Sequence, residues 1–186
     1  MFRLPLFAAA ALAAAAVAQS PLPAPFATPS VTKRAKVVGW PADKTPTAPP
    51  GFAVTAFAKD LDNPRWVYVL PNGDVLVAES RTVPKPKPGE EPKKDAPKSA
   101  NRITLFRDAD KDGTPEVRET FLDLLDQPLG MALVGDTFFV ANTDAVLAFP
   151  YKAGETRISG SGRKIADLPR GGYNNHWTRN VIAGRD

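Results

Sequence analysis

The chain has 186 residues, a length that suits one domain of ordinary size, and a formal net charge of +4. The positive charge is concentrated in residues 81–100, which indicates a solvated loop rather than the basic face of a nucleic-acid-binding protein. There is no cysteine, so disulfides are excluded.

The N-terminus has the three parts of a secretory signal peptide, which we assign to residues 1–18. A short positive region is followed by an alanine-rich apolar run at 4–15, and 16–18 form an A-x-A cleavage site. A retained N-terminal anchor is the alternative, although the run is short for a membrane span. We therefore expect a periplasmic or secreted protein with no membrane span after cleavage.

Residues 19–50 are rich in proline, which prevents a regular helix or a central strand. They predict an extended linker or wrapping arm. Short β segments begin after it, and residues 52–58 alternate in the manner of a strand. Residues 65–70 and 75–80 flank an Asn-Gly pair, which is a strong hairpin signal.

Residues 81–100 are rich in proline and lysine and predict a flexible surface insertion. Strand patterns return at 102–107 and 117–122. A second copy of the same order of elements follows, at 130–134, 137–143, 145–149 and 163–168. Without the insertion the repeat is roughly 44 residues long, near the length of a four-stranded propeller blade.

The fold class is therefore predicted to be all-β, a β-propeller over residues 51–186. A third copy opens at 178–186, so we expect about two blades and the start of a third, the N-terminal part of a larger protein. Two blades alone would leave exposed edges and half a core. A β-sandwich is the alternative fold.

His176 is the only histidine, and it lies in the loop before the third copy. Loops that precede the innermost strand of each blade line the channel of a propeller, and a histidine there can act as a general base at neutral pH. The alternative is a histidine that caps a turn and packs on Trp177.

Three further polar residues occupy equivalent loops. Gln127 can hydrogen-bond a carbonyl or hydroxyl of a ligand, and Arg65 and Arg179 can contact an anion. Each of the three can equally be a structural turn residue.

An acidic loop matches the spacing of a calcium site, D-x-D-x-D-G followed by a glutamate at the twelfth position. Its candidate ligands are Asp108, Asp110, Asp112 and Glu119. Both flanks predict strands, so an ordinary acidic turn is the alternative, and we expect the loop to lie far from the channel.

Several of these segments together resemble the glucose/sorbosone dehydrogenase family, and the L-sorbosone dehydrogenase branch above all. The resemblance covers about residues 51–186. It rests on 64–79, 101–103, 108–113, the loop and strand start at 127–132, 140–142, and Gly171-Gly172 with the His-Trp-Thr-Arg-Asn run at 176–180. Members of this branch commonly have Gly-Gly-His-Trp, whereas residues 173–175 separate the glycines from His176 here.

The resemblance implies a six-bladed propeller in the periplasm that uses pyrroloquinoline quinone (PQQ) with Ca²⁺ in the site. It implies oxidation of a sugar, a sorbosone-like aldehyde or a polyol, with electrons passed to a cytochrome or a quinone. In this family a histidine takes the proton of the substrate hydroxyl, which assigns that role to His176, and Gln127 and Arg179 become candidate cofactor contacts. The alternatives are a calcium-dependent propeller lactonase or other hydrolase, and a non-catalytic binding propeller that displays residues 81–100.

Overall fold

The computed structural model describes residues 24, 36, 38–41, 44–83, 89–91, 94–95, 98–169 and 176–185. The chain divides into two compact units, Met1–Ala42 and Asp43–Asp186, which are treated separately. The described residues of the first unit form no helix or strand, and the signal peptide and most of the proline-rich arm lie outside the described part. In that described part, no helix is long and apolar enough to cross a membrane.

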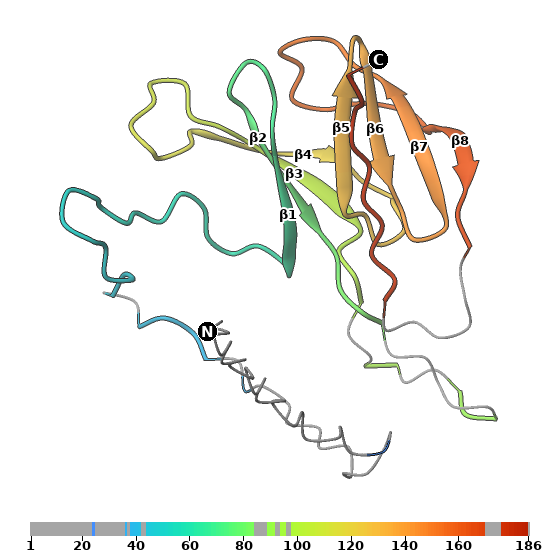
Figure 1. The fold of residues 1–186 in the computed structure, drawn as a ribbon, viewed down its shortest axis with the longest axis horizontal. Coiled ribbons are helices and arrows are strands. Elements are labelled where there is room, and N and C mark those ends of the chain that lie inside the picture. Colours follow the sequence, from blue (N-terminus) through green and yellow to red (C-terminus); the bar gives the residue numbers. More distant parts are fainter. Residues whose placement is uncertain are drawn as a thin grey trace, which may run out of the picture. The chain divides into compact units, whose positions relative to one another are not determined.

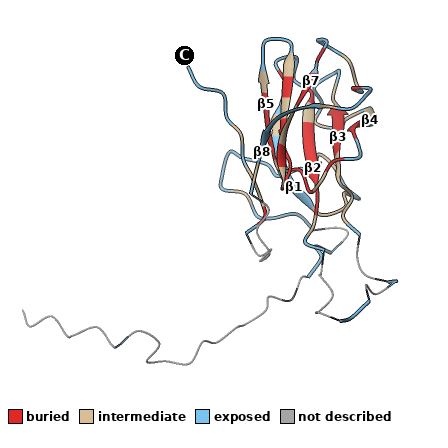
Figure 2. Cartoon of the chain, turned by 90° about the vertical axis from the view of Figure 1, so that its right-hand side faces the viewer, coloured by how far each residue is buried: buried red, intermediate tan, exposed pale blue. Residues whose placement is uncertain are grey.

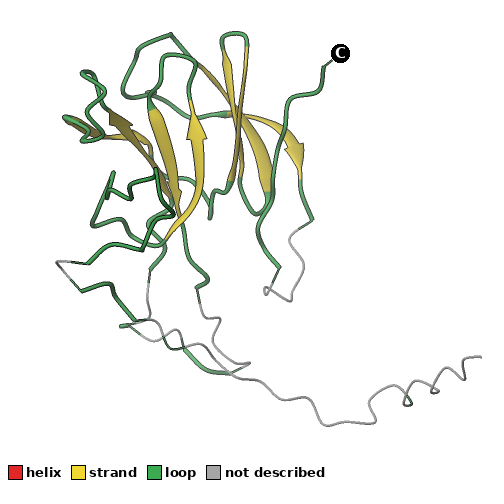
Figure 3. Cartoon of the chain, turned by 60° about the vertical axis from the view of Figure 1, so that its left-hand side comes forward, coloured by secondary structure: helices red, strands yellow, loops and turns green. Residues whose placement is uncertain are grey.

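The second unit consists of β-strands joined by loops, and its described residues contain no helix (Figure 3). The strands are β1 Pro64–Val69, β2 Val75–Glu79, β3 Arg102–Arg107, β4 Val117–Leu122, β5 Gly130–Val134, β6 Thr137–Ala141, β7 Ala145–Pro150 and β8 Arg163–Asp167. They form two antiparallel four-stranded sheets, sheet A (β1–β4) and sheet B (β5–β8), in which each strand pairs with the next along the chain (Figure 1). The all-β class and the repeated four-strand unit are confirmed, whereas the number of six blades stays a prediction.

The Asn-Gly pair forms the tight hairpin that the sequence predicts between β1 and β2. The Leu70 amide donates to the Asp74 carbonyl at 2.9 Å, and Gly73 has a φ of 93°, a left-handed conformation that glycine adopts without strain. Val69 pairs with Val75 directly before the turn. The turn therefore fixes the register of the first hairpin.

The core lies between the two sheets, where buried side chains from both meet. Figure 2 colours the buried stretches of the strands red. Phe121 of sheet A and Phe138 of sheet B are fully buried and meet edge to face, with ring centres 5.3 Å apart. The Tyr68 hydroxyl accepts a hydrogen bond from the Leu133 amide at 3.0 Å. Apolar burial therefore holds the two repeats face to face, and hydrogen bonds such as this one between them add to it.

The prediction of a strand at residues 52–58 is wrong. This segment is extended but pairs with no strand, and Phe52 is 77% exposed. Phe57 instead packs edge to face on Phe106, with ring centres 6.2 Å apart, and Arg118 donates to the carbonyls of Lys59 and Asp60. Side chains of sheet A thus make its contacts with this part of the chain, and residues 52–58 form no ladder.

The prediction that a strand opens a third copy at 178–186 is also wrong, because the described residues 178–185 form no strand. Residues 178–185 form an extended segment beside β5, shown in red in Figure 1. The Gly130 amide donates to the Arg179 carbonyl at 3.0 Å, and a Cβ at Gly130 would lie 2.5 Å from the Val181 nitrogen. Pairing with β5 is therefore limited to a close approach at one glycine.

Candidate functional site

The loops that carry His176, Gln127 and Arg179 lie at one end of the sheets, which we call the loop end. It is the end where β1, β3, β5 and β7 begin and where β2, β4, β6 and β8 finish. The acidic loop joins the end of β3 to the start of β4 and therefore lies at the opposite end. The topology thus brings three predicted site residues to one end and separates them from the predicted calcium loop.

The backbone around His176 is fixed while its side chain is exposed. Arg179 Nη1 donates to the His176 carbonyl at 3.0 Å. The next residue, Trp177, is only 4% exposed, and its indole Nε1 donates to Thr82 Oγ1 at 2.7 Å. An exposed imidazole on an anchored backbone suits proton exchange with a ligand.

Arg65 lies over the ring of Trp177, the residue after His176. Its guanidinium carbon is 5.0 Å from the centre of the Trp177 ring, a cation–π distance. The side chain is exposed, and a hollow of about 310 Å³ lies beside Pro64–Val67. No ion pair joins Arg65 to a carboxylate among the described residues.

Arg179 is a second cation without a carboxylate partner in the described part of the chain. Its Nη1 donates to the carbonyls of His176 and Thr178, and its Nη2 donates to the Pro169 carbonyl at 2.9 Å. These acceptors are neutral, and no ion pair with a described carboxylate compensates the charge of the guanidinium. Arg65 and Arg179 therefore bring two cations to the segment of His176 and Trp177.

Gln127 is 4% exposed and adopts a left-handed φ of 50° in the loop between the sheets. Its Nε2 donates to the Arg81 carbonyl at 2.6 Å, and its backbone amide donates to Asn101 Oδ1 at 3.1 Å. Arg81 precedes Thr82, so these hydrogen bonds connect Gln127 to Trp177. The side-chain nitrogen of Gln127, predicted to bond to a ligand, thus bonds to the Arg81 carbonyl instead. A ligand contact by Gln127 stays a prediction.

The loop end also holds a buried carboxylate, Glu79, which is not among the predicted site residues. Glu79 is fully buried, receives two hydrogen bonds of 2.8 Å from Arg102, and accepts further bonds from the Thr104 hydroxyl and the Asp62 amide. Burial raises the pKa of Glu79, but these hydrogen bonds outweigh it and the net pKa is lowered. A glutamate inside an apolar strand opposite an arginine was the available signal.

A similar ion pair lies at the opposite end of sheet A. Arg107 donates to both carboxylate oxygens of Asp74, and its Nη2 also reaches the Gly154 carbonyl of the second repeat at 2.9 Å. The hydrogen bond from Arg107 is the main cause that lowers the pKa of Asp74, and the same bond raises the pKa of Arg107. This pair therefore stabilises the contact between the repeats.

The acidic loop gathers four carboxylates, but one of them differs from the prediction. Oxygens of Asp108, Asp110, Asp112 and Glu116 lie within 4.8 Å of one another. Glu119 is not in this group, because strand β4 has begun by then and pairs Glu119 with Leu105. The pKa of Asp110 is raised: the Asp112 amide lowers it, but slight desolvation and the charges of Asp112 and Glu116 outweigh that bond.

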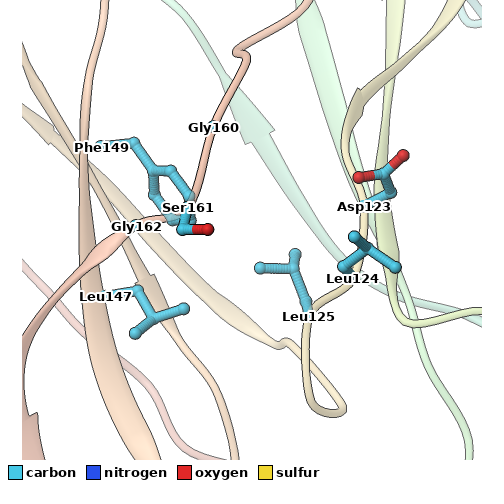
Figure 4. Close-up of a pocket in the computed structure, with 8 residues that line it drawn as sticks. All are labelled: Asp123, Leu124, Leu125, Leu147, Phe149, Gly160, Ser161 and Gly162. Atoms are coloured by element: carbon cyan, nitrogen blue, oxygen red, sulfur yellow. The ribbon is translucent and has the colours of Figure 1, made fainter.

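A separate cleft of about 320 Å³ lies between the chain after β4 and strand β7 (Figure 4). Leu125, Leu147 and Phe149 form its apolar walls, and Leu124 at its edge is 97% exposed. Asp123 and Ser161 are the lining residues with polar side chains, and no cationic side chain lines the cleft. This composition does not suit an anionic cofactor, so the loop end is the better candidate site.

Residues 42–161 match a family described as a domain of unknown function, DUF7133. The chain belongs to the DUF7133 family. No curated protein matches the DUF7133 chain. A solved structure is similar to it, the holo form of the PQQ domain of pyranose dehydrogenase from Coprinopsis cinerea, with 16% identity and a TM-score of 0.48.

That match covers 69% of the DUF7133 chain and 26% of the pyranose dehydrogenase chain. This chain therefore spans about a quarter of the matched protein. A likeness at this level does not fix a cofactor, a substrate or a site residue, and the sorbosone dehydrogenase branch stays a prediction.

Proposed function

We propose that this DUF7133 protein takes part in PQQ-dependent oxidation of a sugar, a sorbosone-like aldehyde or a polyol in the periplasm or outside the cell. His176 is the proton acceptor in this proposal. The observation that carries it is an exposed histidine whose backbone carbonyl is bound by Arg179 and whose neighbour Trp177 lies under the Arg65 guanidinium. No ion pair joins either arginine to a described carboxylate.

The residues at the loop end fit PQQ by their chemistry. PQQ is a planar quinone that carries carboxylate groups. Guanidinium groups bind carboxylates through paired hydrogen bonds and also stack on flat rings. Arg65 and Arg179 supply these donors, and the buried Trp177 ring packs beneath Arg65 and holds it in place.

When bound, PQQ would supply the redox chemistry by accepting the hydride of the substrate. Arg65 and Arg179 would bind and orient its carboxylates. The His176 imidazole would accept the proton of the substrate hydroxyl at a ring nitrogen. Gln127 would hold the loop that carries Arg81 and Thr82, and its direct contact with the ligand is part of the proposal.

The proposal gives the acidic loop a structural role that is separate from proton transfer. Four carboxylates within 4.8 Å suit Ca²⁺, which prefers oxygen ligands. Because the loop lies at the opposite end of the sheets, an ion there would stabilise the β3–β4 connection and would not take part in proton transfer. The Ca²⁺ that the family resemblance implies for the catalytic site is not assigned to these residues.

Two carboxylates at the loop end argue against a calcium-dependent lactonase. Glu79 is bound by Arg102, and Asp62 pairs with Arg81 at 3.1 Å. A catalytic calcium site needs carboxylate oxygens that are available to the ion. Neither of these two carboxylates is available in this way, because an arginine binds each of them.

The test is oxidation of sugars, aldehydes and polyols by the full-length protein, with added PQQ and an artificial electron acceptor. The His176→Gln variant is expected to lower kcat by roughly 10²–10⁴-fold, the usual contribution of a general base. Lys152→Gln, exposed at the opposite end of the sheets, is the control and should retain normal turnover. Near-normal turnover of His176→Gln would remove His176 from the mechanism.

A further inference from the structure

The β2–β3 loop meets the segment of His176 at one buried indole. Trp177 donates from Nε1 to Thr82 Oγ1 at 2.7 Å, a contact between residues 95 positions apart. The ring of Trp177 also lies 5.0 Å from the Arg65 guanidinium carbon. A buried indole N–H needs an acceptor, so the Thr82 hydroxyl determines where Trp177 can sit.

Thr82 lies at the base of the β2–β3 loop, directly after Arg81, whose backbone is held by two hydrogen bonds. The Arg81 amide donates to Ser99 Oγ at 3.0 Å, which joins the two ends of the β2–β3 loop. The Arg81 carbonyl accepts from Gln127 Nε2 at 2.6 Å. Residues 81 and 82 are therefore held on three sides, by Ser99, Gln127 and Trp177.

We infer that Thr82 and Trp177 are positioning residues that set the location of His176, and that the β2–β3 loop controls the site through them. Trp177 and His176 are adjacent, so a shift of the indole moves the histidine backbone with it. Arg179 holds the His176 carbonyl, so the backbone has little freedom to absorb that shift. Any partner that displaces the base of the loop would regulate proton transfer, a consequence that rests on the proposed function.

Three variants isolate the Thr82 hydroxyl. Thr82→Val removes the hydroxyl and keeps a branched side chain, and Thr82→Ser keeps the hydroxyl. Ser99→Ala is the matched control, because it removes another hydrogen bond at the same loop base and leaves Trp177 untouched. Circular dichroism and thermal unfolding of the protein establish that each variant folds.

Two readouts are independent of enzymatic activity. His176 is the only histidine, so its ring Cε1 proton gives one assignable NMR resonance. Trp177 emission is measured with Trp40 and Trp66 replaced by phenylalanine. Thr82→Val should shift the His176 resonance and move Trp177 emission to the red, whereas Thr82→Ser and Ser99→Ala should match the unmodified protein.

In the loaded full-length enzyme, Thr82→Val is expected to lower kcat by roughly 10–100-fold with little change in KM, because a misplaced base costs rate. An unchanged His176 resonance and unchanged Trp177 emission in folded Thr82→Val would overturn the inference. An equal resonance shift in Ser99→Ala would also overturn it, by showing a general effect of the loop. Normal turnover of His176→Gln together with a Thr82→Val shift would reject the proposed function and leave the positioning role standing.

Discussion

Sheets A and B have the same strand order but hold their loop ends by different chemistry. In sheet A, Glu79 is buried and its carboxylate is bound by Arg102 and Thr104. The equivalent residue of sheet B is Asn142, which is 5% exposed and whose Oδ1 has no hydrogen-bond partner among the described residues. The register explains the difference, since sheet B has Ala145 and Leu147 where sheet A has the arginine and the threonine.

The following residue shows the same contrast. Ser80 Oγ in sheet A donates to the Pro128 carbonyl at 2.8 Å, at the start of the next repeat. Its counterpart Thr143 is buried, and its Oγ1 has no partner. The repeats therefore share a backbone pattern, while the polar contacts that anchor each loop end are particular to each sheet.

The largest effect on stability should come from breaking the buried pair of sheet A. Glu79→Ala leaves Arg102 without its partner and is expected to cost about 3 kcal/mol of unfolding free energy, with part of the loss recovered because Arg102 is partly exposed. Urea unfolding measures it. A loss below about 1 kcal/mol would show that the ion pair does not anchor sheet A.

A smaller effect is expected where sheet B meets the C-terminal segment. Gly130→Ala places a Cβ 2.5 Å from the Val181 nitrogen, so the segment must move, at a cost of about 1–3 kcal/mol. Hydrogen exchange should show faster exchange of the amides of residues 179–183. Gly39→Ala, which meets no atom within 4 Å, is the control and should leave exchange unchanged.

Acid should weaken sheet A before sheet B. The pKa values of Glu79 and Asp74 are lowered from ordinary values of 4.5 and 3.8, so their ionised forms stabilise the fold above those values. That contribution is lost as the pH falls through the lowered pKa values. Unfolding free energy measured from pH 6 downward should fall less steeply in the Glu79→Gln/Asp74→Asn double variant, and an identical slope would contradict the assignment.

The smallest effect on stability is expected at Asn142, the neutral residue of sheet B that corresponds to Glu79. Asn142→Ala removes an oxygen that has no hydrogen-bond partner, so the unfolding free energy should change by less than about 1 kcal/mol. The same urea titration used for Glu79→Ala measures it. A cost as large as that of Glu79→Ala would show that the two loop ends are equally dependent on this position.

The strands could be predicted from the sequence because alternation and turn residues act locally. The Asn-Gly hairpin and the strands of both repeats lie close to their expected positions. Residues 52–58 alternate equally well, yet they form no strand, since a strand also needs a neighbour to pair with. Local pattern therefore predicts the extended backbone and leaves its pairing open.

The site could be predicted only in part. His176, Gln127 and Arg179 were placed at one end by the order of the repeats. The contact between Trp177 and Thr82 joins residues far apart in the chain across a long insertion, and no local signal indicates it. Glu119 was expected in the acidic cluster from spacing alone, but the start of β4 gives that place to Glu116.

The most direct test of the account is the affinity of the full-length protein for PQQ, measured by titration at two salt concentrations. Arg65→Gln and Arg179→Gln should each weaken binding by roughly tenfold and reduce its dependence on salt, because each removes a cation that no described carboxylate neutralises. Lys152→Gln, which removes an exposed cation at the opposite end of the sheets, should leave the affinity unchanged. Equal affinity in the unmodified protein and both arginine variants would contradict the assignment of the loop end as the cofactor site.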